Sequence, residues 1–491
     1  MTDFRAADQS IADSLKIDFP KGAKPHIAVL GAGVCGLYAA RILSRAGARV
    51  TVVEREDEVG GLARGYLING NYYDVGVHHL HAWDHEIFED VQTMMGDLLV
   101  PVELVAKIKH GKSFRRYPLE FSDLLLGIPP WTLVSALSSM VFQQMRNKFD
   151  DSKPADAEEA LIRLYGRHLY EYFFRDFTHR YWGFPPTRLS ATFVSRKMPR
   201  LSAVDIVKNW LKKLGVKEKK DIAVDSALRK ETLWYSRIGA SMMPRTMKEY
   251  IESKGGRVIL EAEVSEVEVE DGRVRSVGYM KDGRMEHFAC DAVVSTIPIN
   301  SLVRTVSPSP GEDLIASCDR IKFKAIAIYG LLVKKERVLE DALYVYFREH
   351  VFHRFSEPKG SGVIINPEGH TTILVEITCD VGDDRWVGGE KTRREIIKDL
   401  EDEGMLKAED VVEMHLLTNE WGYPVFELGF EPHLQKLEEF LAGIPNLEST
   451  GRQGAFTYPN MHDAMRMGAK AAQKVSEHLE VGRREEQRVD S

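Results

Sequence analysis

The sequence predicts an α/β fold, in which a parallel sheet assembled from separate pieces of the chain carries an inserted helix-rich domain and a mixed sheet. Three observations predict this fold. Near the N-terminal end, a short apolar run leads through a glycine-rich turn into a helical pattern. A long stretch of mainly helical periodicity follows. Strand and turn patterns then return, and the chain closes on a second glycine-containing turn and an amphipathic helix.

Length and composition limit the class of protein. With 491 residues, the chain exceeds what one hydrophobic core usually organises, so we expect several substructures. Hydrophobic residues make up 44% and charged residues 29%, which is typical of a globular protein. The net charge of −8 offers no general attraction to nucleic acid, and we expect no nucleic-acid partner. The four cysteines form no C-x-x-C pair, which fits a reducing cytoplasm and no thiolate metal cluster.

The first predicted element is a βαβ unit with a dinucleotide-binding turn. The apolar run His26–Leu30 is typical of a buried parallel strand, and Gly31, Gly33 and Gly36 follow it. Gly31 permits the tight turn, Gly33 lets the backbone approach a pyrophosphate, and Gly36 lets the helix pack on the sheet. The next strand, RVTVV, ends at Glu54, which is expected to accept hydrogen bonds from ribose hydroxyls.

The residues after this strand resemble one clan of flavoproteins. Gly60, Gly61 and Arg64 match the Gly-Gly turn and following arginine of the clan that contains amine oxidases, protoporphyrinogen oxidases, phytoene desaturases and UDP-galactopyranose mutases. The resemblance implies a Rossmann-type (glutathione-reductase-like) domain that binds FAD. It also implies that Arg64 lies near the pyrophosphate and ribityl chain of FAD.

Two later blocks resemble the same clan in the expected order. The backbone near Val264 corresponds to the segment that borders the adenine in the clan. The block that begins with Gly451 and Arg452 resembles its last motif, with the arginine near the flavin. The helix that starts around Met461 would place its positive N-terminal end beside the flavin, where a helix dipole stabilises negative charge.

These blocks divide the chain as follows. We expect a flexible leader (1–25), three parts of the FAD-binding domain (26–80, 241–300 and 431–480), a helix-rich cap or substrate domain (81–240), a substrate-binding sheet region (301–430) and a disordered tail (481–491).

One uncharged segment in the cap bears on the location of the protein. Leu124–Met145 carries no formal charge, but Gly127, Pro129 and Pro130 interrupt it. Three alternatives stay open: helices that line a substrate cavity, a patch that dips into a membrane, or a membrane span. Because residues 1–25 contain no stretch that resembles a signal peptide, we expect a cytoplasmic protein, with contact at the inner membrane as the alternative.

Aromatic residues are dense in the cap between Leu161 and Ser190. Tyr170, Phe173, Phe174 and Phe177 follow a helical period and are predicted to be core residues. Trp182 stands before a glycine at the predicted helix end. It is a candidate to stack a planar or cyclic group of the substrate, with a core position as the alternative.

Two candidate catalytic residues come from a histidine loop. The run from Gly76 to His81 resembles the loop of the mutases in which a histidine lies over the flavin, so His78 and His81 are candidates. Val77 stands where the mutases have a second glycine. The alternative is that one or two of these histidines only pack against backbone carbonyls. We expect no metal site, because no carboxylate completes a ligand set at a fixed spacing.

The substrate side contains a further resemblance to the mutases. Arg354 lies in a segment similar to the one whose arginine clamps the substrate diphosphate, and a guanidinium suits that role because it forms paired hydrogen bonds. Tyr423 and Tyr458 fall where mutase tyrosines contact the same group. Arg354 is therefore both a catalytic and a substrate-binding candidate.

Three functions follow as alternatives. The first is an FAD-dependent oxidoreductase that transfers a hydride from an amphiphilic or sugar-linked small molecule to flavin N5. The second is a redox-neutral mutase of the UDP-galactopyranose mutase type, in which reduced FAD is the nucleophile. The third is a binding protein stabilised by FAD. The expected substrate is phosphorylated, prenyl-linked or nucleotide-linked, and a homodimer is an open alternative.

Overall fold

The central layer is a five-stranded parallel sheet, which confirms the predicted α/β class. The computed structural model describes residues 17, 19, 24–103, 105–110, 113–117, 130–147, 149–150, 152–197 and 232–489. Strands from distant parts of the chain meet in this sheet. Their order is β10 (Arg257–Ile259), β2 (Arg49–Val53), β1 (His26–Leu30), β14 (Ala292–Ser295) and β21 (Leu447–Ser449), and all neighbours are parallel.

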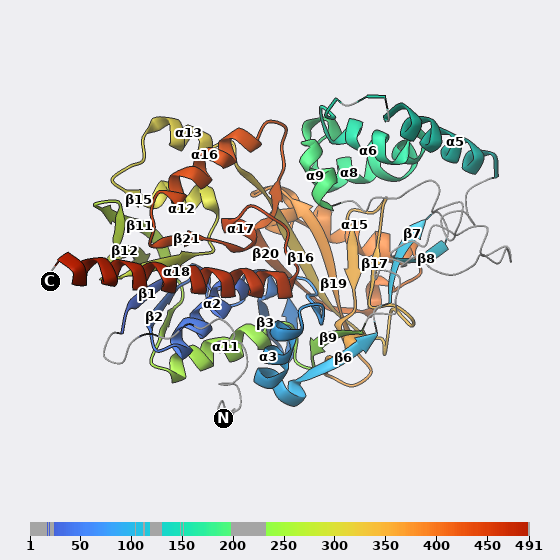
Figure 1. Ribbon diagram of the computed structural model, residues 1–491. Coiled ribbons are helices and arrows are strands. Elements are labelled where there is room, and N and C mark those ends of the chain that lie inside the picture. The colour runs from blue at the N-terminus through green and yellow to red at the C-terminus, as the bar shows by residue number, and fades with distance from the viewer. Residues whose placement is uncertain are drawn as a thin grey trace, which may run out of the picture.

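Helices cover the parallel sheet. The helix α2 (Val34–Arg45) contacts both α11 (Met242–Ser253) and α18 (Met461–Val489) (Figure 1). The approach of α18 to α2 is close, because a Cβ on Gly468 would come within 2.3 Å of a backbone oxygen of α2. The helix α18 continues to Val489, where we expected a disordered tail from residue 481. Arg, Glu and Gln are good helix formers and dominate this stretch.

Two further sheets complete the mixed architecture. The four-stranded sheet has the order β13 (Arg284–Ala289), β12 (Arg273–Lys281), β11 (Glu263–Glu270) and β15 (Val306–Ser307). The seven-stranded sheet has the order β20 (Val411–Val425), β16 (Lys322–Val333), β19 (Thr371–Cys379), β18 (Arg354–Ser356), β17 (Tyr344–Tyr346), β7 (Ala106–His110) and β8 (Ser113–Tyr117). The strand β19 is buried along its whole length, so it lies in the core of this layer.

Shorter elements connect these layers. Two small sheets pair β3 with β4, and β9 with both β5 and β6. The strands are β3 (Gly65–Ile68), β4 (Asn71–Asp74), β5 (Leu80–His81), β6 (Leu99–Glu103) and β9 (Thr232–Ser236). The remaining helices outside the cap are α3 (His85–Met95), α12 (Ile299–Thr305), α13 (Glu312–Cys318), α14 (Asp384–Val387), α15 (Glu390–Asp402), α16 (Glu431–Ala442) and α17 (Gly451–Gly454).

Among the described residues, the inserted region is helical in its middle part, and the predicted segment 81–240 also includes α3, which contacts α11 and α18. The helices of the middle part form a group of their own at the upper right of Figure 1. They are α5 (Pro130–Asn147), α6 (Ala157–Tyr165), α7 (Arg167–Leu169), α8 (Arg175–Trp182) and α9 (Ala191–Lys197). The flanks of the predicted helix-rich segment 81–240 also contain strands, and β7 and β8 form the edge of the seven-stranded sheet. Each of these strands is only five residues long and carries at most two apolar aliphatic residues, so their pattern was too short to predict from the sequence.

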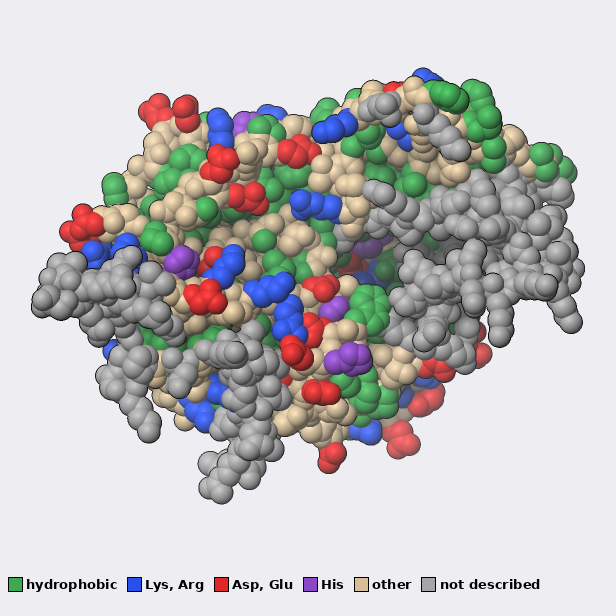
Figure 2. Space-filling model, viewed as in Figure 1, with side chains coloured by type: hydrophobic (Ala, Val, Ile, Leu, Met, Phe, Trp, Pro, Cys, Tyr) green, Lys and Arg blue, Asp and Glu red, His purple; other side chains and the backbone are tan. Residues whose placement is uncertain are grey.

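The uncharged segment is described from residue 130 onward as α5, and its residues 124–129 lie outside the described part. None of the described helices is long and apolar enough to cross a membrane. Ala136 and Met140 are buried on the inner side of α5. Its outer side exposes apolar side chains, which gather at the upper right of Figure 2, whereas acidic and basic side chains are interspersed elsewhere on this face. The exposed apolar residues of α5 are Trp131, Val134, Val141, Phe142 and Met145.

Candidate functional site

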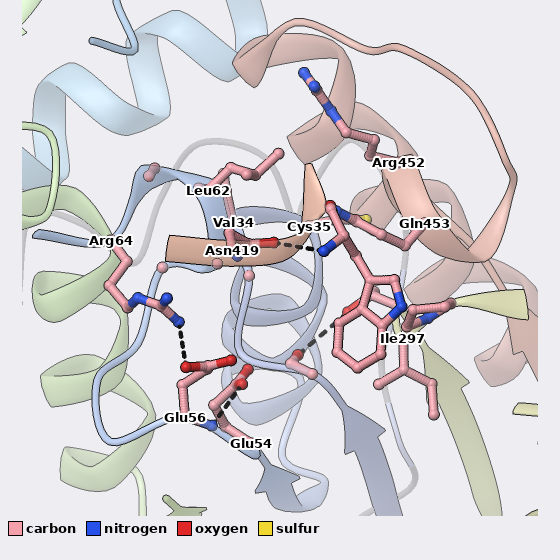
Figure 3. Close-up of a pocket in the computed structure, with 18 of the residues that line it drawn as sticks. Val34, Cys35, Glu54, Glu56, Leu62, Arg64, Ile297, Asn419, Arg452 and Gln453 are labelled. Atoms are coloured by element: carbon pink, nitrogen blue, oxygen red, sulfur yellow. Dashed lines mark hydrogen bonds and ion pairs between the residues drawn. The ribbon is translucent and has the colours of Figure 1, made fainter. Parts of the chain in front are cut away.

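A cavity of about 400 Å³ lies at the carboxyl ends of β1 and β2. This is the edge at which parallel sheets bind nucleotides. The cavity extends from the glycine turn to β20, α17 and the start of α18 (Figure 3). Most of the predicted cofactor residues line it, together with one predicted catalytic histidine. They are Gly31, Gly33, Glu54, Gly60, Gly61, Arg64, Val264, Arg452, Met461 and His78.

The glycine turn has the geometry of a phosphate-binding loop. Gly31 has a φ of +96°, and a Cβ on Gly36 would lie 2.2 Å from the Gly31 carbonyl oxygen, so neither position accommodates a side chain. A Cβ on Gly61 would come 3.1 Å from the Gly33 Cα, so the two glycine loops approach closely. The helix α2 starts at Val34, and its first turn contains no acidic residue. Its N-terminal N–H groups are therefore suited to bind phosphate oxygens.

Glu54 ends β2 at the rim of the cavity. Its carboxylate accepts hydrogen bonds from the backbone N–H of Ala32, at 2.6 Å, and of Glu56, at 3.0 Å. Burial raises the pKa of Glu54, and these two N–H groups oppose the shift. The two hydrogen bonds hold the carboxylate in place, and its remaining lone pairs can accept hydrogen bonds from ribose hydroxyls.

Arg64 is a buried cation beside the cavity. Its side chain is 2% exposed, its Nη1 lies 2.9 Å from Glu56 Oε2, and its Nη2 donates to the Thr418 carbonyl at 3.1 Å. Figure 3 shows Arg64 and Glu56 pointing toward each other. The Arg64 Nε is buried and has no hydrogen-bond partner among the described residues. A buried orphan donor at a cavity wall fits an acceptor supplied by a bound dinucleotide.

The opposite walls come from β11 and β20. Val264 lies at a bulge in the pairing of β11 with β12, and its neighbours Ala262 and Glu263 also line the cavity. On β20, Trp421 lines the cavity, and the Arg55 guanidinium lies over its ring, 4.0 Å from the ring centre. Of these residues, Val264 and its neighbours lie in the segment that the resemblance links to the adenine.

His78 and Arg452 lie at the other end of the cavity. The His78 Nδ1 is 3.0 Å from the Gly76 carbonyl, so this nitrogen carries the proton and Nε2 presents a lone pair. Burial lowers the pKa of His78 to about 4, and the charges of Arg354 and Arg452 add to the effect. The imidazole is therefore neutral at pH 7. Arg452 donates to the Pro459 carbonyl at 3.0 Å and lies 5.8 Å from the centre of the Tyr423 ring.

Gly451 and Met461 lie at this end, whereas Gly36 lies in the first turn of α2 against Gly31. Gly451 has a φ of +79°, and a Cβ there would lie 3.2 Å from the Cys35 side chain, so the turn before Arg452 packs tightly on α2. Gly451 and Gly36 do not themselves line the cavity. Met461 does line it, because α18 begins there and directs its N-terminal end toward the predicted flavin position.

Beyond His78, a buried carboxylate organises the substrate side. Glu376 on β19 accepts hydrogen bonds from Arg354 Nη2, from the His353 Nε2 at 2.8 Å and from the Tyr423 hydroxyl at 2.9 Å. Burial alone would raise the pKa of Glu376, but the Arg354 guanidinium and these hydrogen bonds hold it well below its usual range. The carboxylate is thus ionised and its charge is compensated by Arg354.

The predicted substrate-side residues differ in where they lie. His78, Arg354 and Tyr423 are brought together, and the Tyr458 ring lies 6.5 Å from the Tyr423 ring. Gly76 has a φ of +90°, which favours glycine, and a Cβ there would come 3.3 Å from His78 Cε1 and 3.4 Å from Arg354 Nη2, so this turn brings the two side chains close together.

His81 and Trp182 are not brought to this cluster. The His81 ring packs 4.4 Å from Trp83 and 5.5 Å from His462. Trp182 is 2% exposed and packs edge-on against Phe193 and Tyr181, so the core alternative describes its position. A large flat side chain gains more from complete burial at the base of the cap than from contact with solvent.

Sequence reasoning did not identify Glu376, His353 or Trp421. For Glu376 a signal was available, because it is the only charged residue in the otherwise apolar or hydroxylic run TTILVEITC of β19. A charge in a fully buried strand needs a partner, which points to a site. His353 and Trp421 stand in segments without such a contrast.

The fold and the cavity define an α/β protein with a glycine-lined cavity at the carboxyl ends of a parallel sheet. Residues 34–476 match the family described as flavin containing amine oxidoreductase, and the chain belongs to this family. Membership implies a flavin cofactor. It places the chain among the flavoproteins of the amine oxidase superfamily.

Similar curated proteins come from several branches of this superfamily. A probable UDP-galactopyranose mutase from Klebsiella pneumoniae is 26% identical over 186 residues, which are 37% of this chain and 47% of that protein. A phytoene dehydrogenase from Streptomyces griseus is 28% identical over 328 residues, which are 60% of this chain and 58% of that protein. An L-amino-acid oxidase from Siganus canaliculatus is 29% identical over 150 residues, 29% of this chain and 28% of that protein. The matches therefore span less than two thirds of these relatives.

Solved structures share the fold over almost the whole chain. A crystal structure of reduced UDP-galactopyranose mutase has a TM-score of 0.76 at 21% identity and covers 92% of this chain and 94% of that chain. A putative protoporphyrinogen oxidase from Exiguobacterium has a TM-score of 0.65 at 15% identity, with 92% and 99% covered. At these identities the likeness concerns the fold.

Proposed function

We propose that the protein is an FAD-dependent oxidoreductase that accepts a hydride from a small amphiphilic or sugar-linked molecule. The observation that carries the proposal is the compensation of Arg354 by Glu376 on the substrate side. A site that expels a diphosphate needs net positive charge near the leaving group. Here the arginine expected to supply that charge is already paired.

Several features of the cavity support FAD as the cofactor. The two glycine loops, the orphan Nε of Arg64 and the acceptor Glu54 suit the pyrophosphate and the ribose. The start of α18 suits the flavin end, because a helix N-terminus stabilises negative charge on a reduced ring. When bound, FAD supplies the hydride acceptor.

The residues around Glu376 are suited to the charge that develops during such an oxidation. A carbon that loses a hydride becomes more positive. Because Glu376 pairs with Arg354, the substrate side presents no net positive charge that would oppose this change. His353 and Tyr423 hold the Glu376 carboxylate in place. His78 presents a neutral Nε2, which can accept a hydrogen bond from an N–H or O–H of the substrate and orient its C–H bond.

Anaerobic reduction tests this proposal. The FAD-loaded, oxidised protein is mixed without oxygen with separate panels of amines, polyprenyl compounds and sugar nucleotides, and the visible absorbance of the flavin is followed. Bleaching by one class, with formation of the oxidised product in equal amount, is expected. If dithionite-reduced protein instead interconverts a UDP-hexose without consuming an oxidant, the oxidoreductase proposal fails.

A mutase is the second candidate, and one observation favours it. Arg452 forms no ion pair with a carboxylate among the described residues, so one cation remains at the flavin end beside Tyr423. The similarities to a probable UDP-galactopyranose mutase and to the reduced mutase structure add to this candidate. Activity that requires the reduced protein and conserves the redox state of the substrate would establish it. Absence of both activities would favour an FAD-stabilised binding protein.

A further inference from the structure

A second cavity, of about 380 Å³, lies between the cap helix α8 and the seven-stranded sheet. We call it the basic pocket, and it is lined by α8, the loop between β17 and β18, the end of β19 and α14. His353 lines the basic pocket and stands between it and Glu376. Five further lining residues are arginines or histidines. They are His179, Arg180, Arg348, His350 and Arg385.

The three arginines of the basic pocket form no ion pair with a carboxylate in the described part of the chain. Their hydrogen bonds go to backbone carbonyls: Arg180 donates to His350, Arg348 to Tyr172, and Arg385 to Thr378 at 3.4 Å. Carboxylates lie near without pairing with these arginines: Asp399 accepts the Val351 N–H at 2.7 Å, and Glu403 lies 3.0 Å from His350 Nε2. The exposed Glu349 acts on Arg180 and Arg348 only through its charge, which partly opposes the effect of burial on their pKa values.

The positive charges crowd one another. Burial lowers the pKa of Arg180, and the nearby charge of Arg385 lowers it further. Burial also lowers the pKa of Arg348, whose Nε is buried without a hydrogen-bond partner among the described residues. Guanidinium groups remain charged at neutral pH. Gathering such cations without carboxylate partners costs free energy, and a bound anion would offset that cost.

We propose that the basic pocket binds a phosphate group. This inference rests on the proposed function, because it concerns the substrate of the same site. Arginine forks match the oxygen geometry of phosphate, and several converging arginines suit a diphosphate better than a single carboxylate. The His353 ring connects the two places, since it lies 4.8 Å from the Tyr181 ring and donates to Glu376. The phosphate group bound in the basic pocket is either part of the substrate or a free phosphate ion.

Calorimetric titration of the FAD-loaded protein with inorganic pyrophosphate tests the pocket itself. Arg385→Gln and Arg180→Gln each remove one charge, and each is expected to weaken binding at least about tenfold, the usual effect of a lost charge-assisted hydrogen bond. Arg175→Gln is the matched control, because Arg175 lies on the same helix, pairs with Asp176 and does not line the pocket. Ionic strength is held constant, since it screens exposed charges.

The outcomes separate the pocket from the proposed function. Equal pyrophosphate binding in all three variants, or no binding to the unchanged protein, overturns the inference, whatever the flavin does. Far-UV circular dichroism and flavin content show that the variants are folded. Competition identifies the source: a substrate that reduces the flavin and displaces pyrophosphate carries the phosphate group, whereas pyrophosphate that stays bound marks a site for free phosphate. Binding without any flavin reduction contradicts only the oxidoreductase.

Discussion

Arg354 and Glu376 face each other across adjacent antiparallel strands and form an ion pair in the interior of the seven-stranded sheet. They are register partners of β18 and β19, so the sheet itself sets their separation. Breaking such a pair leaves an uncompensated charge in a buried place, which is costly. The pairing of the two strands therefore holds both charges at set positions on the substrate side, which an arginine on a flexible loop would not do.

Replacing Glu376 tests the charge it provides. Glu376→Gln keeps the size of the side chain but removes the carboxylate, and we expect flavin reduction by substrate to slow by about 10²- to 10³-fold, the usual effect of losing a preorganised electrostatic group. Stopped-flow absorbance measures this rate. Glu368→Gln, at an exposed position before the same strand, is the control and should keep the full rate. A normal rate in Glu376→Gln would refute the role of the charge.

Tyr423 positions that carboxylate through its hydroxyl group. Tyr423→Phe removes the hydrogen bond to Glu376 but keeps the ring beneath Arg452, so kcat should fall by about tenfold or more while KM changes little. The matched control is Tyr279→Phe, which loses a similar hydrogen bond to Glu286 in the four-stranded sheet. Steady-state kinetics distinguishes the two variants. A change in KM alone would mean that Tyr423 binds substrate and does not act through Glu376.

Gly33 offers a test of the cofactor site that leaves the fold intact. A Cβ at Gly33 meets only Gly61, at 4.0 Å, and the φ of −69° suits any residue. Gly33→Ala should therefore cost less than about 1 kcal/mol of stability, yet fill the space through which the backbone approaches the pyrophosphate. We expect at least about tenfold weaker FAD binding, measured by titrating the apoprotein. Normal affinity in a folded variant would place the pyrophosphate elsewhere.

The sequence predicts the cofactor side of this protein better than the substrate side, for a physical reason. Gly31, Gly33 and Glu54 act within one βαβ unit, whose local rules fix where they lie. Glu376 and Arg354 meet only because two strands pair in one register, and sequence separation does not specify that pairing. The family resemblance identified Arg354 but could not supply its partner.

Side-chain direction was the second limit. Trp182 had two consistent positions, at the core or against a ligand, and packing against Phe193 selected the first. His81 is the last residue of the histidine loop in the sequence, but it belongs to β5, and its ring packs against Trp83. Tertiary packing thus decides which residues of a recognised motif reach the site.

His78 links the site to the pH dependence of stability. Burial, with the charges of Arg354 and Arg452, lowers its pKa to about 4, and burial lowers the pKa of His79 to about 3. The unfolded chain binds protons at these histidines below about pH 6.5, whereas the folded chain does not until about pH 4 or lower. Their stabilising contribution is present above that range and is lost as the pH falls toward the folded pKa.

The contribution of His78 alone is roughly 3 kcal/mol, because its pKa falls from 6.5 to about 4 on folding. Urea unfolding at about pH 7.5 and about pH 5 should show a smaller free energy of unfolding at the lower pH. In His78→Gln the free energy of unfolding should differ less between the two pH values, because the variant no longer takes up that proton on unfolding. His85→Gln changes an exposed histidine of α3 and should keep the difference. An unaltered pH dependence in His78→Gln would mean that the pKa of His78 is the same in the folded and the unfolded chain, which contradicts the buried, neutral ring.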